Sequence, residues 1–393
     1  MEKLLPRHYD KLEKHIQPGK VLLIFGPRRV GKTTLVKTYL KRNKIDCLSV
    51  TGDQARTLEV FSSRDERLMM DFIGGKGLLF IDEAQKIPDI GNNLKLLVDT
   101  HPELTVIATG SSSFQLAGQT GEPLTGRKHT LLLYPLAEIE LAPLHSPFET
   151  KENYSKHLIY GMYPSILTSQ SISAKERELT ELVDSYLYRD ILEFDRIKNP
   201  QQLRSLLQLL AFQIGSEVSL NELSLRLRID VKTVGRYIDL LEQSFVLYRL
   251  SGFSRNLRKE ITSKSKYYFY DLGVRNALIN NFNPLNLRDD QGKLWENHMV
   301  VERLKSRTYR ELSASDFFWR TWSQQEIDLV EQRAGRLYAY EFKWSDGKTP
   351  RLPSAFAEAY PGTPYTVVTP SNSHAFLTEL LRVERQNDVR THR

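Results

Sequence analysis

A glycine-rich segment with lysine and threonine at fixed positions is the clearest chemical pattern in the sequence. The segment matches G-x-x-x-x-G-K-[ST] and then adds Thr34; its residues are Gly26, Pro27, Arg28, Arg29, Val30, Gly31, Lys32 and Thr33. Glycines let backbone N–H groups wrap around phosphates, and a helix starting here adds positive potential. Lys32 would contact the β- and γ-phosphates, and the Thr33 hydroxyl would bind Mg²⁺. The pattern predicts a site for ATP and Mg²⁺ built from residues 26–34.

An acidic pair stands fifty residues after this lysine. The apolar run Gly77–Ile81 leads directly into Asp82 and Glu83. Ligands of parallel sheets bind at the carboxyl ends of the strands, where this pair would lie. Asp82 would hold the Mg²⁺ through water, and Glu83 would orient or deprotonate the attacking water. The pair predicts hydrolysis of the nucleotide as well as its binding.

Two further positions could complete such a site. After the next apolar run, Ser111 is the first choice to sense the γ-phosphate and Thr109 the second, although a serine-rich turn would look the same. Arg127 lies on the following loop and could complete the site of a neighbouring subunit by stabilising charge during phosphoryl transfer. The alternative for Arg127 is a solvated basic loop.

These residues need a sheet to position them. Short apolar runs predict strands at Val21–Phe25, Ile45–Val50, Gly77–Ile81 and Leu104–Ala108, and a helix is expected over Thr33–Lys41. Buried strands that alternate with helices form a parallel sheet covered by helices. We therefore expect an α/β protein whose first domain, residues 1–145, has a P-loop parallel sheet.

Four segments resemble the predicted AAA-type ATPases of bacteria and archaea: GPRRVGKTT, FIDEAQKIPD, ATGSSS and LTGRKHTLLLYPLAEIE. The resemblance implies an AAA-like fold, with Lys32 as the Walker lysine and Asp82 and Glu83 as the Walker acidic pair. It places the G-R motif of the family on Arg127. It also implies assembly of identical subunits into a ring or partial ring, with a hexamer as one such size, and a C-terminal domain of poorly defined function.

A basic module follows a helical linker that we expect over residues 146–210. Residues 201–270 hold 11 Lys and Arg against 6 Asp and Glu. Ser219 begins a capping pattern for a helix over 220–227, and Asp230 would cap a second helix over 231–243. With strands at 245–250 and 266–270, residues 211–280 are predicted to form a winged helix. Its candidate DNA contacts are Lys232, Arg236, Arg255, Arg258 and Lys259.

This module would contact the phosphates of duplex or branched DNA without reading the base sequence, because few of its side chains suit base edges. Packing against protein is the alternative.

The last segment, residues 285–393, carries a second group of candidate metal ligands. Asp328 and Glu341 fall on two strand-like runs joined at Gly335, and Lys343 shares a face with Glu341. Glu296, on the preceding helix, would join them. Carboxylates suit Mg²⁺ or Mn²⁺, with Lys343 orienting an activated water. The pattern Asp328…Glu341-x-Lys343 resembles the PD-(D/E)xK nuclease fold, a restriction-endonuclease-like α/β domain. It would either cleave or only bind; an ion pair on an exposed strand is the simpler alternative.

Composition limits the remaining possibilities. The 393 residues include 26% charged residues, a net charge of +7 and a single cysteine, Cys47. No intramolecular disulfide or Cys-based zinc site can form, and the scattered histidines suggest no zinc site. No apolar run approaches the roughly 20 residues of a membrane helix, so we expect a cytoplasmic protein without a membrane partner.

Three functions fit these patterns. The first is an ATP-hydrolysing, DNA-binding AAA-type protein that remodels or translocates duplex or branched DNA. The second is a metal-dependent nuclease gated by the ATPase. The third is a nucleotide-dependent switch that contacts protein.

Overall fold

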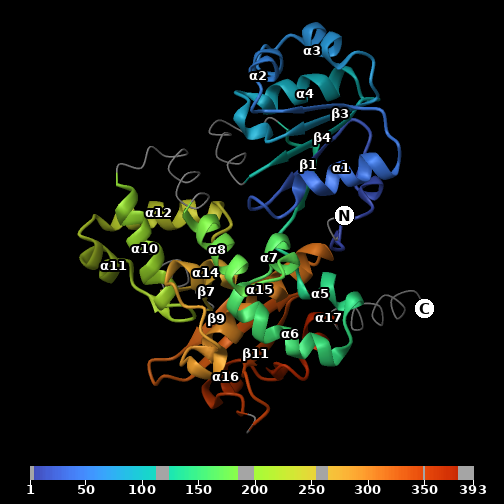
Figure 1. Cartoon of the computed structure of the whole chain (residues 1–393). Helices are drawn as coiled ribbons and strands as arrows, with labels where there is room; N and C mark the ends of the chain where they lie inside the picture. Colours follow the sequence, from blue (N-terminus) through green and yellow to red (C-terminus); the bar gives the residue numbers. More distant parts are fainter. Residues whose placement is uncertain (1–3, 112–123, 185–198, 254–263, 348–349, 379–393) are drawn as a thin grey trace. The chain divides into compact units, whose positions relative to one another are not determined.

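The structure is a computed structural model that describes residues 4–111, 124–184, 199–253, 264–347 and 350–378. The chain divides into two units. The N-terminal unit comprises residues 1–135 and 243–245, and the C-terminal unit comprises residues 136–242 and 246–393. Each unit has its own sheet (Figure 1).

The sheet of the N-terminal unit has five strands in the order β2-β3-β4-β1-β5, and every neighbouring pair is parallel. The predicted parallel sheet is therefore confirmed. β4 lies between the strand that precedes the glycine-rich segment and the strand that carries the acidic pair. The strands are β1 (Val21–Phe25), β2 (Leu48–Thr51), β3 (Leu78–Asp82), β4 (Thr105–Gly110) and β5 (Lys128–Leu132).

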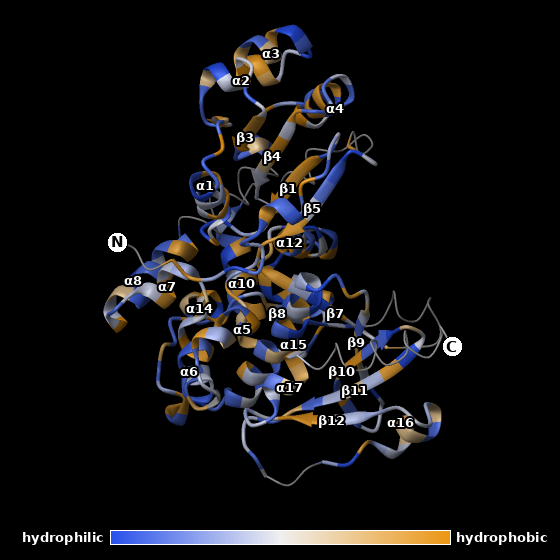
Figure 2. Ribbon diagram, turned by 90° about the vertical axis from the view of Figure 1, so that its right-hand side faces the viewer, coloured by the Kyte–Doolittle hydropathy of each residue, from blue (hydrophilic) through white to orange (hydrophobic). Residues whose placement is uncertain are grey.

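Helices cover both faces of this sheet because the central strands are apolar on both sides. In β1, Val21, Leu23 and Phe25 face a core that receives side chains from α2, α3 and α4. Figure 2 shows hydrophobic residues along β1 and β3. The helices of this unit are α1 (Lys32–Arg42), α2 (Ala55–Phe61), α3 (Glu66–Ile73) and α4 (Ile90–Thr100), with 3-10 turns at Leu12–Lys14 and Ala84–Lys86.

The C-terminal unit contains a mixed sheet of seven strands in the order β12-β11-β10-β9-β7-β8-β6. β7, β8 and β6 are antiparallel neighbours, as are β9, β10 and β11, while β7 pairs with β9 in parallel. The strands are β6 (Glu217–Val218), β7 (Leu247–Gly252), β8 (Ser265–Phe269), β9 (Ser315–Arg320), β10 (Glu326–Arg333), β11 (Arg336–Phe342) and β12 (Tyr365–Val368).

This sheet differs from the expectation of separate modules at 211–280 and 285–393. The predicted wing strands do pair with each other, but β7 also pairs with β9 through Ser251 and Phe317. β7 is thus an internal strand, with both edges hydrogen-bonded. The backbone N–H and C=O groups along one side of β7 pair with those of β9, which is distant in sequence. Neither strand is therefore left with that side exposed.

A long helix, α15 (Gln291–Tyr309), lies at the centre of this unit and contacts β8, β11 and α17. Charged side chains on it, including Glu296, Glu302 and Arg303, are buried and paired. The other helices are α5 (Glu138–Leu141), α6 (Pro147–Tyr160), α7 (Pro164–Thr168), α8 (Ile172–Leu182), α10 (Pro200–Phe212), α11 (Leu220–Leu227), α12 (Val231–Gln243), α14 (Leu272–Leu278), α16 (Ser354–Ala359) and α17 (Ser373–Thr378), with 3-10 turns at Ala142–Leu144 and Leu285–Leu287. Among the described residues, no helix combines the length and apolar character needed to cross a membrane.

Candidate active site

The glycine-rich segment forms a tight loop between β1 and α1. Gly26 has a φ of 148°, and a Cβ there would overlap the carbonyl oxygen of Leu133. Gly31, with a φ of 95°, is the N-cap of α1. Only glycine takes up both conformations without strain. The Lys32 side chain is 5% exposed and donates to the carbonyl oxygens of Gly26 (2.9 Å) and Pro27 (2.7 Å). The loop is thus closed by the lysine that was predicted to contact phosphate.

The acidic pair lies beside this loop at the end of β3. The Thr33 hydroxyl is 2.9 Å from each carboxylate oxygen of Asp82. Thr109, in the neighbouring strand β4, also donates its hydroxyl proton to Asp82. A hydroxyl and a carboxylate at hydrogen-bonding distance match the oxygen ligands that Mg²⁺ prefers. Thr33 and Asp82 therefore fit a magnesium ion.

Glu83 is held in a left-handed backbone conformation, with a φ of 51°. Its backbone N–H donates to the Thr109 hydroxyl at 3.3 Å, and its carboxylate accepts a hydrogen bond from Gln85. Gly52 packs against the Glu83 carbonyl, where a Cβ would overlap it. These contacts fix the second carboxylate at the same end of β3 as Asp82.

Of the two proposed sensor residues, Thr109 makes the contact with Asp82, whereas Ser111 is buried one residue beyond the end of β4. Ser111 as the first choice to sense the γ-phosphate stays a prediction. The register of β4 against β3 pairs Ala108 with Ile81 and so sets Thr109 beside Asp82, and the sequence does not contain this register. The serines at 112 and 113 lie outside the described residues.

Arg127 and the glycine-rich loop lie at opposite ends of the parallel strands. It precedes β5, and its carbonyl oxygen accepts from the N–H of Val21, the first residue of β1. The loop follows the last residue of β1, about 16 Å further along the strand. Arg127 forms an ion pair with Asp99. It therefore does not contact the phosphate site of its own subunit, and a role in a neighbouring subunit stays a prediction.

The basic module forms the two predicted helices, α11 and α12. Ser219 accepts from the N–H of Glu222 (3.4 Å), and Asp230 accepts from the N–H of Thr233 (3.2 Å). Lys232 and Arg236, one helical turn apart, are exposed on α12, opposite its buried apolar face. Three of the predicted DNA contacts, Arg255, Arg258 and Lys259, lie outside the described residues.

In the C-terminal unit, the structure brings together the predicted carboxylates. Lys343 donates to Glu341 at 2.7 Å, and Asp328 accepts from the backbone N–H of Phe342 at 2.9 Å. The predicted hairpin forms, with Gly335 at a φ of 73° in its turn. Burial raises the pKa of Asp328 well above its usual range, and the nearby carboxylates of Glu296 and Glu341 raise it further.

A lysine that the sequence analysis missed occupies the middle of this group, which we call the carboxylate cluster: Glu296, Glu326, Asp328 and Glu341. Lys266, 1% exposed on β8, lies 2.6 Å from Glu326, 3.0 Å from Glu296 and 4.0 Å from Asp328. Tyr268, on the same face of β8, donates to Glu296 at 2.6 Å. Burial alone would lower the pKa of Lys266, but the three carboxylates raise it overall.

A signal for Lys266 was present in the sequence. It is the one charged residue within the apolar and aromatic run of β8, Ser265–Phe269. A lysine in a buried strand is rare unless it is paired. The sequence could not name its partners, because β8 meets the cluster through α15 and the neighbouring strands of the sheet.

Comparison with known proteins divides the chain into three segments, two of which fall almost entirely within the C-terminal unit. Residues 18–142 match the model of an AAA domain, and residues 151–285 and 291–385 match two domains of unknown function, DUF8612 and DUF4143. Residues 18–142 form an AAA domain. This match implies ATP binding and an ATPase.

The relatives are uncharacterized proteins of bacteria and archaea. A protein of Mycobacterium tuberculosis is 28% identical over 339 residues, which cover 85% of this chain and 72% of the relative. Proteins of Haemophilus influenzae (26%, covering 81% and 80%) and Methanocaldococcus jannaschii (23%, covering 81% and 74%) are also similar.

Two solved structures align with low TM-scores. The Drosophila ORC bound to DNA has a TM-score of 0.25 and 14% identity, covering 68% of this chain and 91% of that chain. The AMPPCP-bound DnaA of Aquifex aeolicus has a TM-score of 0.23 and 19% identity, covering 58% and 84%.

Proposed function

We propose that the protein hydrolyses ATP and uses the energy to remodel or translocate duplex or branched DNA. The observation that carries the ATPase part is the convergence of Thr33, Asp82 and Thr109 beside the loop closed by Lys32. These residues come from α1, β3, β4 and the glycine-rich loop, so the sheet order itself assembles the site.

Each residue has a distinct proposed role. Lys32 exchanges the carbonyl oxygens of Gly26 and Pro27 for the β- and γ-phosphates, which offer a stronger charge-assisted interaction. Thr33 and Asp82 hold a Mg²⁺ ion, which neutralises charge on the phosphates when bound. Glu83 orients the attacking water and accepts its proton. The Thr109 hydroxyl positions both acidic residues, because it donates to the Asp82 carboxylate and accepts from the backbone N–H of Glu83.

The proposal that DNA is the substrate rests on α11 and α12. Lys232 and Arg236 are exposed on one face of α12, while Val234, Ile238 and Leu241 bury the other face. A helix of this kind can lie against the phosphate backbone, and cations one turn apart neutralise neighbouring phosphates. Arg255, Arg258 and Lys259, outside the described residues, are proposed to add further phosphate contacts. Its contacts would be independent of base sequence.

The subunits are proposed to assemble into a ring or partial ring, for which a hexamer is one candidate. Arg127 supports this proposal because it lies far from the phosphate site of its own subunit. In the site of a neighbour, Arg127 would exchange its ion pair with Asp99 for the nucleotide and stabilise the charge of the transition state.

ATP hydrolysis measured with no DNA, single-stranded DNA, duplex and a four-way junction tests the function. We expect one DNA form to stimulate the rate of ATP hydrolysis. Lys32→Ala should abolish hydrolysis with every DNA form. The double variant Lys232→Ala/Arg236→Ala should lose the stimulation and part of the salt dependence of DNA binding while it keeps the basal rate. A rate that is indifferent to all DNA forms would favour the nucleotide-dependent protein switch. Turnover that survives in Lys32→Ala would refute the ATP site.

The carboxylate cluster favours a second function, an ATP-gated, metal-dependent nuclease. Asp328 and Glu341 would hold Mg²⁺ or Mn²⁺ together with Glu296, and Lys343 would orient the water. Lys266 opposes this function because its ammonium already compensates the carboxylates. The test is cleavage of DNA with Mg²⁺ or Mn²⁺. Glu341→Ala should abolish cleavage and spare ATP hydrolysis, and cutting that persists in this variant would refute the nuclease site.

A further inference from the structure

Three side chains that are distant in sequence meet inside the C-terminal unit: Glu138, His157 and His298. They come from α5, α6 and α15. The Oε1 atom of Glu138 lies 2.7 Å from Nδ1 of His157 and 2.9 Å from Nε2 of His298. Each of the three side chains is at most 6% exposed. We call this group the histidine–glutamate cluster.

The geometry of the cluster matches a metal site. One carboxylate oxygen and two imidazole nitrogens lie within 4.8 Å of one another. Two histidines and one glutamate are a known ligand set for Zn²⁺ with a fourth position left for water. Because imidazole nitrogens predominate, the set suits a transition metal better than Mg²⁺ or Ca²⁺, which prefer oxygen ligands alone.

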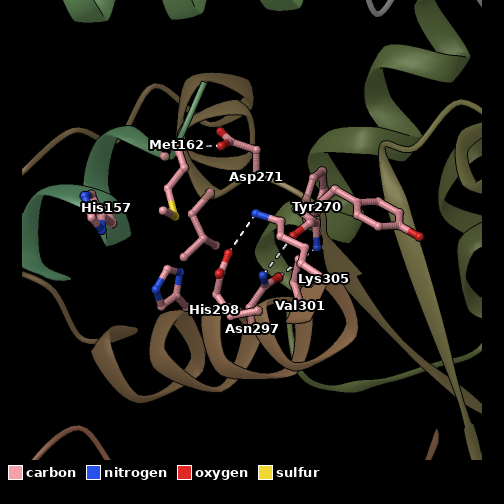
Figure 3. A pocket seen from close by; sticks show the side chains of 12 residues that line it. His157, Met162, Tyr270, Asp271, Asn297, His298, Val301 and Lys305 are labelled. Atoms are coloured by element: carbon pink, nitrogen blue, oxygen red, sulfur yellow. Dashed lines mark hydrogen bonds and ion pairs between the residues drawn. The ribbon is translucent and has the colours of Figure 1, made fainter. Parts of the chain in front are cut away.

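A small cavity adjoins the cluster and provides space for a fourth ligand. Its lining includes both histidines together with Asn297, Asp271 and Lys305 (Figure 3). Polar groups of this kind can hold a buried water by hydrogen bonds. A water in this cavity would lie beside the two histidines of the cluster.

The local charges also favour a cation. Glu138 forms its ion pairs among the described residues with the two imidazoles, whereas the neighbouring Glu302 is already paired with Lys305 at 2.7 Å. A buried carboxylate is costly unless a positive charge accompanies it. The two imidazoles supply hydrogen bonds to this carboxylate, and a divalent metal would supply both ligation and charge.

We propose that Glu138, His157 and His298 bind a divalent transition metal, Zn²⁺ in the first instance, with water as the fourth ligand. The ion would tie α5 and α6 to the central helix α15. This site is separate from the proposed ATP and nuclease functions. The sequence carries no recognisable zinc pattern here, because the glutamate stands 19 residues from one histidine and 160 from the other.

The test uses the full chain freed of any histidine tag and loaded with Zn²⁺ in the absence of nucleotide. After desalting, bound metal is counted by mass spectrometry. We expect the wild type and the control His374→Ala, which removes an exposed histidine, to hold one equivalent. His298→Ala and Glu138→Gln should weaken Zn²⁺ affinity by more than the roughly 10–100-fold caused by losing an outer-shell partner. The Thr33–Asp82 site is intact in these variants, so the difference isolates the cluster.

A second readout keeps the proposal testable if a variant fails to fold. The wild-type chain loaded with Co²⁺ should give the intense visible bands of a tetrahedral site with nitrogen ligands. A spectrum that shows nothing beyond the weak bands of octahedral Co²⁺ would overturn the proposal. Wild type that retains no more Zn²⁺ than a folded His298→Ala variant would also overturn it. The cluster would then be a hydrogen-bonded contact between a carboxylate and two histidines.

Discussion

Lys266 offers the sharpest test of the forces inside the C-terminal unit. Its ammonium lies among Glu296, Glu326 and Asp328, and its side chain is almost fully buried. Lys266→Met keeps the length and apolar stem of the side chain but removes the charge. The three carboxylates would then lose the cation at their centre, and among the described residues only Glu326 would keep an ion pair, with Arg320 at 3.7 Å.

The cost of this change follows from the carboxylates. Removing one partner of a buried ion pair typically destabilises a protein by about 3–5 kcal/mol. The native state can limit the loss by taking up a proton on one carboxyl. For a carboxyl of ordinary pKa, near 4.3, neutralisation at pH 7 costs about 3.7 kcal/mol. Because Glu326 is partly exposed and keeps some hydration, we expect a loss of about 3–4 kcal/mol.

The loss should depend on pH. Carboxyls freed from Lys266 would have native pKa values above those of the unfolded chain, so the native variant binds more protons. The stability of the variant therefore rises relative to wild type as the pH falls. The deficit should be largest near pH 8 and smaller near pH 5. In the wild type the raised pKa of Lys266 keeps it charged over this whole range.

Tryptophan fluorescence during urea unfolding measures the stability of the C-terminal unit, where the substitution lies. All four tryptophans lie between residues 295 and 344, within the C-terminal unit. Lys264→Met is the matched control, because Lys264 lies just before β8, is exposed and is 3.9 Å from Glu217. We expect that control to change stability by no more than about 0.5 kcal/mol.

Equal midpoints for Lys266→Met and Lys264→Met would refute the role of Lys266 as the compensating charge. A deficit that grows as the pH falls would refute the argument about proton uptake. Adding Mg²⁺ separates a third possibility. If Mg²⁺ binds to the carboxylate cluster of the Lys266→Met variant and restores its stability, the ammonium of Lys266 takes the place of a divalent ion in the wild type.

Three further changes have definite expected outcomes. Asp328→Asn should unfold at a higher urea concentration than wild type at pH 8, and the gain should vanish towards pH 4, since the raised pKa of Asp328 costs stability above the ordinary carboxyl range. Gly26→Ala should abolish binding of a fluorescent ATP analogue, because its Cβ would overlap backbone, whereas Gly77→Ala, which points into open space, should bind it normally. Thr109→Val should lower the rate of ATP hydrolysis by about tenfold with little change in ATP affinity, since it removes the hydroxyl that orients Asp82; an unchanged rate would assign the sensing role elsewhere, with Ser111→Ala as the next variant.

The sequence alone determined the features that depend on neighbouring residues. The glycines and lysine of the phosphate loop, the apolar strand before Asp82 and the capped helices α11 and α12 all form where their patterns predicted. The hairpin at Gly335 forms for the same reason, because a short turn needs only a left-handed backbone conformation. Each of these signals lies within about fifteen residues, the range over which backbone preference and hydrophobic periodicity act.

The tertiary structure alone decided which distant side chains meet. The register of β4 against β3 sets Thr109 beside Asp82. The direction of β5 sets Arg127 at the end of the sheet away from the phosphate loop. The pairing of β7 with β9 joins residues 211–280 and 285–393, which were predicted to be separate modules, in one sheet. Strand β8 of this sheet carries Lys266. The meeting of Glu138 with His298 across 160 residues has no local signal. Strand order, register and helix packing determine such contacts, and these arise only when the apolar faces of the whole chain are buried together.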